Sequence, residues 1–431
     1  MPTASNDKKP RPIGGEFAAM DAVKSWQTVW RDVNLATFDP RINTPYGAIL
    51  DGAVALQNDE IVWVGLTADI PQWLPPETQV FSGEGKWFTP GLIDCHTHMV
   101  FAGNRADEFE KRLHGIDYAS IAKQGGGILS TVAKTRVASH KELLLSARER
   151  INWLQREGVT HIEIKSGYGL DLESERKILE VAIELAKVCD IDVTTTFLGA
   201  HTVPPEFKSD PDSYVQYVCE TMLPALHAEG LINCVDVYCE HIAFNLAQTE
   251  RIFQQAKNLN LRIKIHAEQL SHMGGAKLAA RYGAVSCDHL EFAKPSDVKA
   301  MAKAGCTAVL LPTAFYFLQQ TQKPPIALLR KYGVPMAVAT DANPGSSPTN
   351  SLLLAINMAC TQFNLTPEEA LLGVTRCAAQ ALGLSEHVGT ISVGKKAHLV
   401  LWDIKHPNEL AYYLGINRVY KVVKNGEVVL T

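Results

Sequence analysis

The sequence predicts an α/β protein: a (β/α)8 TIM-type barrel with a small β-sandwich domain that is built from both the N-terminal and the C-terminal segments. Three observations predict this fold. Short β-branched runs alternate with amphipathic helical stretches through the middle of the chain. Both ends carry short strands separated by turn signals instead. The length of 431 residues suits one large barrel and one small domain.

The β-rich ends have the same alternating pattern of apolar and polar residues. Three such runs lie near the N-terminus, at residues 28–38, 48–57 and 60–65. Four lie near the C-terminus, at Thr390–Gly394, His398–Asp403, Arg418–Lys424 and Glu427–Leu430. The last two flank Asn425-Gly426, a strong hairpin signal. We therefore predict a composite β-sandwich domain from residues 25–87 plus 386–431, after a disordered lead-in at residues 1–24.

The barrel is predicted over residues 88–385, where strand-like and helical patterns alternate. The eight strand-like runs are Leu92–Asp94, Thr160–Ile164, Val193–Phe197, Val235–Tyr238, Arg262–Ile265, Val285–Cys287, Ala308–Leu311 and Met336–Ala339. Helical periodicity is clearest at Lys141–Arg156, Glu173–Val188 and Ser213–His227. The long first interval contains Gly125-Gly126-Gly127, which we expect to form a mobile active-site loop.

Charge and cysteine usage exclude several classes of protein. Lys plus Arg is 41 and Asp plus Glu is 46, so the net charge of −5 gives no reason to expect nucleic acid or an anionic membrane. No uncharged apolar run approaches the roughly 18 residues of a transmembrane helix, and the polar N-terminus does not resemble a secretory signal. Nine cysteines without a C-x-x-C motif predict reduced thiols in a cytoplasmic protein.

Polar side chains follow the predicted barrel strands, at the end of a barrel where catalytic residues gather. His96 and His98 stand two residues apart on a strand end, so both side chains point the same way. Taken alone, this pair is also compatible with two unrelated histidines. Together with His266 and Asp341 at two other strand ends, it predicts a site for zinc or ferrous iron.

Longer motifs carry a resemblance to a known family. The segment from Pro90 to His98 (PGLIDCHTH) resembles the first-strand motif of the amidohydrolase superfamily. His266, His289 and Asp341 fit the fifth, sixth and eighth strands of that superfamily. Within it, the chain resembles the imidazolonepropionase family at Phe101–Arg105, Glu163–Leu170, Phe197–His201 and Thr340–Ser346. The resemblance covers nearly the whole chain after about Ser25.

This resemblance implies a metal-dependent hydrolase that opens a ring C–N bond of 4-imidazolone-5-propanoate, giving N-formimino-L-glutamate in histidine degradation. We expect water to add to the ring carbon between the two nitrogens. The resemblance implies one divalent ion per chain, Zn²⁺ or Fe²⁺, with His96, His98, His266 and Asp341 as ligands. The fourth predicted strand contains no lysine that could bridge two ions, and Lys165 lies on the second, so we expect Lys165 to be structural or to support the metal ligands from behind.

The remaining site residues divide into proton transfer and substrate binding. Asp341 is the first candidate to move the proton, and His289 is the second, unless it is simply a buried, paired histidine. Gln269 stands where some members have Glu, so we expect it to hydrogen-bond the reacting ring, with Glu268 in reserve as a proton shuttle. Arg105 is expected to bind the propionate, although an exposed arginine is the alternative. The resemblance adds substrate contacts at Tyr168, His201, Asn343, Gly345 and Ser346, and a weaker one at Tyr118.

Two alternatives stay open at the level of sequence. Another mononuclear-metal amidohydrolase, such as a nucleobase-type deaminase or a cyclic amide hydrolase, would share the barrel and the ion, but a nucleobase deaminase needs no carboxylate clamp at Arg105. A non-enzymatic barrel would have lost its metal ligands, and all four are present here. The expected partners are a small-molecule substrate and water, with no nucleic acid and no membrane, in a homodimer.

Overall fold

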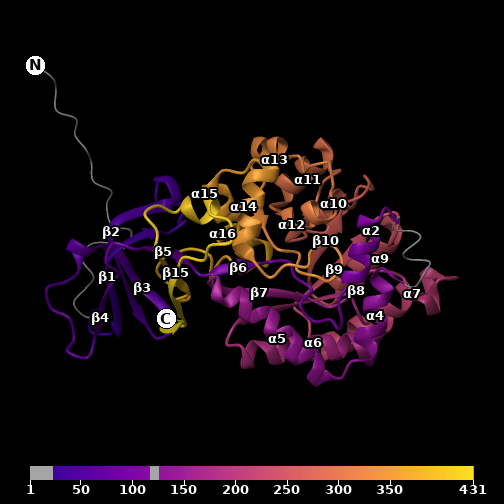
Figure 1. Ribbon diagram of the computed structural model, residues 1–431, viewed down its shortest axis with the longest axis horizontal. Coiled ribbons are helices and arrows are strands. Elements are labelled where there is room, and N and C mark those ends of the chain that lie inside the picture. The colour runs from indigo at the N-terminus through magenta and orange to yellow at the C-terminus, as the bar shows by residue number, and fades with distance from the viewer. Residues whose placement is uncertain (1–22, 117–125, 431) are drawn as a thin grey trace, which may run out of the picture. The chain divides into compact units, whose positions relative to one another are not determined.

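The computed structural model describes residues 23–116 and 126–430 (Figure 1). Most of the predicted lead-in, Tyr118 and Gly125 lie outside these described residues. The chain divides into two compact units. One comprises the described residues within Met1–Gly91, Glu386–Pro407 and Arg418–Thr431, and the other comprises those within Leu92–Ser385 and Asn408–Asn417. The predicted combination of a barrel with a β-structure from both chain ends is confirmed.

The first unit is built on one eight-stranded sheet that joins both ends of the chain. Its central strand β1 runs antiparallel to β2 and parallel to β4 and β5, and β14 continues the sheet antiparallel to β5. The strands are β1 (Thr28–Ala36), β2 (Ala48–Gln57), β3 (Glu60–Leu66), β4 (Gln79–Ser82), β5 (Trp87–Pro90), β14 (Leu399–Trp402), β15 (Val419–Lys424) and β16 (Glu427–Leu430).

Apolar side chains cover both faces of this sheet. Trp30, Leu35 and Phe88 belong to the core on one face, and Val29 and Trp63 belong to the core on the other. Neighbouring residues of β1 therefore point into different cores, as strand alternation requires.

The predicted strand at Thr390–Gly394 is wrong, because this segment forms no ladder. Its alternation still has a physical origin. Ile391 is 1% exposed and its backbone N–H donates to Thr37 O, whereas Val393 is 47% exposed. A docked loop can thus alternate between inside and outside without pairing as a strand.

The second unit contains eight parallel strands, and each of the eight predicted runs overlaps one of them. In the order in which they pair, they are β6 (Leu92–Asp94), β7 (Val159–Lys165), β8 (Asp192–Ala200), β9 (Cys234–Cys239), β10 (Arg262–Ala267), β11 (Ser286–His289), β12 (Thr307–Leu310) and β13 (Met336–Val338). Their residues are almost completely buried, including the polar side chains that alternate with apolar ones on β7 and β10.

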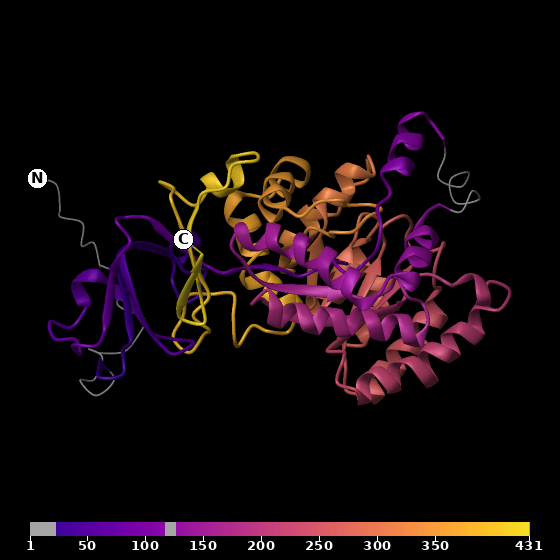
Figure 2. The ribbon, with the colours of Figure 1, turned by 60° about the horizontal axis from the view of Figure 1, so that its bottom comes forward.

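Helices follow the strands and surround them (Figures 1 and 2). They are α2 (Ala106–Leu113), α4 (Ile128–Val137), α5 (His140–Arg156), α6 (Leu172–Val188), α7 (Pro211–Tyr217), α8 (Leu223–Ala228), α9 (Leu246–Asn258), α10 (Gly275–Arg281), α11 (Pro295–Ala304), α12 (Pro312–Phe317), α13 (Ile326–Tyr332), α14 (Leu352–Phe363), α15 (Pro367–Gly373), α16 (Arg376–Ala381) and α17 (Glu409–Tyr412). None of the helices in the described ranges is long and apolar enough to cross a membrane.

Two of the three predicted helices agree closely with α5 and α6. The third, Ser213–His227, is helical throughout but is divided into α7, a π-helical turn at Val218–Met222, and α8. Pro224 follows this turn and has no N–H to donate, so the regular α-helical bonding pattern is interrupted there.

The barrel closes through the segments that follow its first and last strands. Asp341 N donates to His96 O at 3.0 Å, and His98 N donates to Ala342 O at 2.9 Å. Thr97 and Ala342 form a parallel bridge between the two segments. Because closure occurs beyond β6 and β13, the two histidines and Asp341 lie side by side at the C-terminal end of the barrel.

Candidate active site with a metal centre

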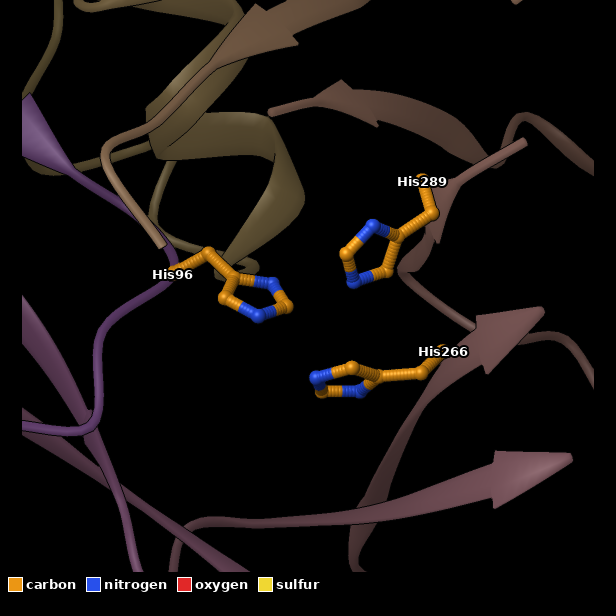
Figure 3. Close-up of side chains that lie close together, drawn as sticks. All are labelled: His96, His266 and His289. Carbon is orange, nitrogen blue, oxygen red and sulfur yellow. The ribbon is translucent and has the colours of Figure 1, made fainter. Parts of the chain in front are cut away.

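Buried imidazoles converge at the C-terminal end of the barrel. The rings of His96, His266 and His289 point toward one another (Figure 3), and their candidate ligand atoms lie within 4.8 Å of one another. His96, His98 and Asp341 form a second group of this kind. The Nε2 atoms of His96 and His98 lie 3.4 and 3.5 Å from Asp341 Oδ1. All five side chains are at most 4% exposed.

This donor set fits a divalent metal ion. In the described part of the chain, His96 Nε2, His98 Nδ1 and His289 Nδ1 are buried and have no hydrogen-bond partner. An unpaired buried polar atom costs about 1–3 kcal/mol, so such atoms in a cluster call for a bound partner. Imidazole nitrogens and carboxylate oxygens are suitable ligands for zinc and for ferrous iron.

The charge states of these residues also favour a cation. Burial lowers the pKa of His96 and of His98, which keeps both rings neutral and able to bind a metal. Burial opposes ionisation of Asp341, but the electrostatic influence of the neighbouring His96, His98 and His289 outweighs it and holds the pKa of that carboxyl well below its usual range. The cluster therefore presents neutral imidazoles and one carboxylate.

Two aspartates orient two of the histidines. His96 Nδ1 lies 2.6 Å from Asp288 Oδ2, and His266 Nδ1 lies 3.0 Å from Asp236 Oδ2. A carboxylate at Nδ1 favours the tautomer with its proton there, and this leaves the lone pair of Nε2 for a metal. The first contact crosses the barrel from the segment after β6 to β11, whereas the second joins the paired strands β10 and β9.

Two lysines hold these aspartates in place from inside the barrel. Lys165 Nζ donates to Asp236 Oδ2 at 2.7 Å and lies 2.9 Å from Glu163 Oε2. Lys264 Nζ donates to Glu163 Oε2 at 2.8 Å. Both ammonium groups lie 3.7 Å from Asp288 Oδ2. Lys165 is therefore engaged in buried ion pairs, in agreement with its predicted structural role.

Aromatic side chains line one side of His98. The ring of His201 stacks on that of His98, with 5.3 Å between centroids and 22° between planes, and Tyr168 lies 5.9 Å from His98. His201 Nδ1 lies 3.2 Å from Gly167 O, and a carbonyl oxygen only accepts, so this contact places the proton on Nδ1. Burial lowers the pKa of His201 and raises that of Tyr168, so both side chains are neutral near pH 7.

Glu268 and Gln269, which follow β10, have different hydrogen-bond partners. The carboxylate of Glu268 accepts bonds of 2.7, 2.9 and 3.0 Å from the backbone N–H groups of Gly274–Ala276, at the start of α10. Its positive φ of 54° turns it away from the strand alternation. The reserve role of Glu268 in proton transfer is therefore wrong. Gln269 Oε1 accepts a hydrogen bond of 2.9 Å from Tyr238 Oη.

A turn after β13 connects Asp341 with Arg105. Asn343 Oδ1 accepts hydrogen bonds of 2.8 Å from the backbone N–H groups of Gly345 and Ser346. Ser346 Oγ lies 3.4 Å from Asp341 Oδ2. A Cβ atom at Gly345 would collide with Arg105 Nη1, so only glycine lets the guanidinium lie against this turn.

A cavity of about 540 Å³ opens beside the turn, a size that suits a small ligand. Arg105, Asn343 and Phe101 line it together with Arg150. Arg150 Nη1 donates to Met99 O at 2.7 Å, so this residue of α5 fixes the chain between the H-x-H pair and Arg105. Burial lowers the pKa of Arg150 to about 10.

Sequence reasoning missed the residues that support the cluster from below. Glu163, Asp236, Lys264 and the orienting role of Asp288 were not predicted. A signal was available, because Lys264 stands two residues before His266 on one strand, and such residues share a face. A lysine on the interior face of a barrel strand indicates buried carboxylate partners.

Comparisons with known proteins identify the family. A sequence profile of the Amidohydrolase family matches residues 196–429. Imidazolonepropionases from Shewanella sp. strain MR-4 and Shewanella putrefaciens strain CN-32 are each 57% identical to the chain over 405 residues, which is 94% of this chain and 99% of theirs. The chain belongs to the imidazolonepropionase family of amidohydrolases. It is therefore a hydrolase that acts on C–N bonds, as the resemblance implied.

Solved structures share the fold of the chain. An adenosine deaminase from Xanthomonas campestris with bound zinc has a TM-score of 0.70 at 20% identity, covering 94% of this chain and 93% of that one. An atrazine chlorohydrolase from Arthrobacter aurescens TC1 complexed with zinc has a TM-score of 0.67 at 17% identity, covering 94% and 95%. At these identities the likeness concerns the fold alone. Family membership and the buried donor set together indicate a divalent metal at this site.

Proposed function

We propose that the protein hydrolyses 4-imidazolone-5-propanoate to N-formimino-L-glutamate, in histidine degradation and in the cytoplasm. The identity of 57% to imidazolonepropionases over 94% of the chain carries this proposal. The structure also supports it, since Arg105 lines a cavity of suitable size and offers a cation that can bind the propionate. The alternative of a nucleobase-type deaminase leaves Arg105 without a purpose.

The bond that breaks follows from the atoms of the product. The formimino group keeps one carbon bonded to both nitrogens, whereas the carbon of the ring carbonyl becomes a carboxylate. Water oxygen therefore bonds to the carbonyl carbon, and the bond from that carbon to the ring nitrogen breaks. The expectation that water adds between the two nitrogens is wrong, because that addition would not form the second carboxylate.

We propose one ion per chain, zinc or ferrous iron, with His96, His98, His266 and Asp341 as its ligands. Buried charges support this count. Glu163, Asp236, Asp288 and Asp341 carry four negative charges and the two lysines carry two positive ones, so one divalent cation neutralises the cluster. A divalent ion would polarise the ring carbonyl and lower the pKa of a water molecule from 15.7 toward about 7.

Proton transfer falls to Asp341 in this proposal. Its lowered pKa keeps it ionised near pH 7, so it can accept the proton of the attacking water and pass it to the ring nitrogen as the C–N bond breaks. Burial lowers the pKa of His289 to about 3, so this ring is neutral and acts as a hydrogen-bonding group rather than as an acid. Its φ of 79° is a strained conformation of the kind that clusters at active sites.

Substrate binding is assigned to polar and aromatic side chains outside the proposed set of metal ligands. Arg105 would bind the propionate, and Gln269, held by Tyr238, would hydrogen-bond the reacting ring. The turn after β13 would place Ser346 beside Asp341. The proposed substrate contacts are Arg105, Tyr168, His201, Gln269, Asn343, Gly345 and Ser346. We also propose a homodimer, which light scattering after gel filtration would test.

The deciding experiment is an activity assay with protein that has been freed of metal and reloaded with Zn²⁺ or Fe²⁺. We expect the ultraviolet absorbance of 4-imidazolone-5-propanoate to disappear and N-formimino-L-glutamate to form, as detected by mass spectrometry. Arg105→Gln should raise KM about tenfold or more, because the carboxylate loses a charged, paired donor. Absence of turnover by the metal-loaded protein, or release of ammonia from a nucleobase instead, would contradict the proposal.

A further inference from the structure

Arg105 already has a carboxylate partner in its own helix. Arg105 precedes α2, and Glu108 lies in the first turn of that helix. Arg105 Nε donates to Glu108 Oε2 at 2.8 Å, and Nη2 lies 2.7 Å from the same oxygen. Each side chain is 14% exposed, so this ion pair is shielded from bulk water. The expected binding residue for the propionate is therefore partly neutralised before any substrate arrives.

The two edges of the guanidinium have different neighbours. Nε and Nη2 face Glu108, whereas Nη1 lies against Gly345 in the turn after β13. The ion pair of Arg105 with Glu108 uses Nε and Nη2 and does not involve Nη1. Arg105 also lines the cavity together with Asn343. Glu108 thus occupies one edge of the fork and leaves the other edge for a ligand.

Glu108 is itself held from a second direction. Its Oε1 accepts a hydrogen bond of 3.1 Å from the backbone N–H of Gly127, the residue that precedes α4. Its neighbour Asp107 is exposed on the same helix. Figure 2 shows α2, in purple, standing apart from the other barrel helices, and none of its residues is buried. The contacts of Glu108 therefore help to fix Arg105 at the start of α2, whose Phe109 stacks on Phe317.

We propose that Glu108 is a positioning residue that sets how strongly Arg105 binds a carboxylate. The inference rests on the proposed function. Glu108 holds the guanidinium with Nη1 toward the cavity, and its negative charge weakens the attraction of Arg105 for anions. The substrate carries one carboxylate and the product carries two. A weakened cation site therefore helps the more negative product to leave while it still selects a substrate with a carboxylate.

The test separates orientation from charge with two variants. Glu108→Gln keeps the shape of the side chain and one acceptor oxygen but removes the charge. Glu108→Ala removes the acceptor oxygen and the charge. Asp107→Asn is the matched control, since it removes one negative charge from the adjacent residue. The probes are imidazole-4-propanoate, which lacks the reacting carbonyl, and its neutral amide. Their affinities are measured by calorimetry, and KM, kcat and product inhibition are measured with 4-imidazolone-5-propanoate.

For Glu108→Gln we expect the acid to bind about tenfold more tightly, because a nearby opposing charge has been removed. Affinity for the amide should stay unchanged, and product inhibition should become stronger. Glu108→Ala should bind the acid less tightly than the glutamine variant does, since the guanidinium is no longer oriented. Asp107→Asn should change each value by less than about twofold, because exposed charges are screened.

An unchanged ratio of acid to amide affinity in Glu108→Gln would overturn the inference, because a purely structural residue gives that result. The same holds if Asp107→Asn has an equal effect, or if glutamine and alanine weaken acid binding alike. Failure of the proposed function is distinguishable from these results. In that case the wild-type protein would not open the ring, although the acid would still bind and respond to Glu108→Gln.

Discussion

At the scale of single residues, the sequence predicted which candidate ligands lie together better than it predicted the residues that support them. His96, His98, His266 and Asp341 could be identified because strand ends and longer motifs mark them. The contact between His96 and Asp288 could not, since it crosses the barrel interior between two segments that are 192 residues apart in sequence. Glu268 shows a further limit. Strand alternation places it with His266, but its φ of 54° directs the carboxylate to α10 instead.

Gly345 offers a prediction at this scale. Gly345→Ala would place a Cβ atom against Arg105 Nη1 and displace the guanidinium. We expect KM for 4-imidazolone-5-propanoate to rise about tenfold with little change in kcat, because the loss falls on carboxylate binding. Steady-state kinetics measure both values.

The control for Gly345→Ala is the same substitution in an Arg105→Lys background. Lysine lacks the planar fork, so the added methyl group has less to displace, and the two substitutions should not be additive. If Gly345→Ala raised KM by the same factor in both backgrounds, its effect would not act through Arg105.

At the scale of elements, a strand was missed where its residues do not alternate between apolar and polar. All eight barrel strands were predicted, because short runs rich in β-branched residues alternate with amphipathic helices along this part of the chain. β4 and β5 were missed, since all four residues of β4 are exposed and all four of β5 are buried. Neither strand alternates, so neither gives the signal that identified β1, β2 and β3. Pairing with β1 defines β4, and pairing with β1 and β14 defines β5.

Asp39 allows a prediction about how the N-terminal and C-terminal segments are joined within the first unit. Asp39 follows β1, and its Oδ2 accepts a hydrogen bond of 2.7 Å from Ser392 Oγ, which lies in the C-terminal part. Burial opposes ionisation of Asp39, but hydrogen bonds from Arg41 and from Ser392 outweigh it and lower the pKa from 3.8 to about 2. The ionised form is therefore the one that stabilises the fold.

The sign of the pH dependence follows from this shift. A lowered folded-state pKa gives a stabilisation that is present above pH 3.8 and is lost as the pH falls toward 2. We expect Asp39→Asn to lower the free energy of unfolding by about 1 kcal/mol at pH 7, since Arg41 is largely in water. Urea unfolding, followed by tryptophan fluorescence, should show this difference shrinking between pH 4 and pH 2.

The exposed Asp59 provides the control for Asp39, because Asp59→Asn removes the same charge from the same unit. It should leave the free energy of unfolding nearly unchanged at both pH values. A difference between Asp39→Asn and wild type that stayed constant from pH 7 to pH 2 would contradict the assignment of this stabilisation to the ionised carboxyl.

At the scale of the whole molecule, the barrel gathers charge that no single strand could hold. Glu163 and Lys165 come from β7, Asp236 from β9, Lys264 from β10 and Asp288 from β11, and all five are fully buried. The sequence predicted the fold and a divalent ion, since motifs and donor types mark both. It could not choose between zinc and iron, because imidazole and carboxylate ligands suit either.

Metal removal should therefore destabilise the barrel itself. Without a cation, the cluster keeps an excess of negative charge and several unpaired ring nitrogens in a buried site. A ligand at 1,000 times its Kd stabilises a folded protein by about 4 kcal/mol. We expect the chelated protein to unfold at a temperature several degrees below that of the loaded protein, and Zn²⁺ or Fe²⁺ to restore it. Differential scanning calorimetry measures both transitions.

Asp341→Asn tests the contribution of the ion, because it removes the carboxylate charge that lies beside both His96 and His98. In this variant the added ion should raise the unfolding temperature much less than in wild type. Elemental analysis of active wild-type protein should find one ion per chain, since Lys165 is held by Glu163 and Asp236 and is not available to bridge two. Two ions per chain at full activity, or equal unfolding temperatures with and without metal, would contradict a single ion that completes the charge balance of the barrel.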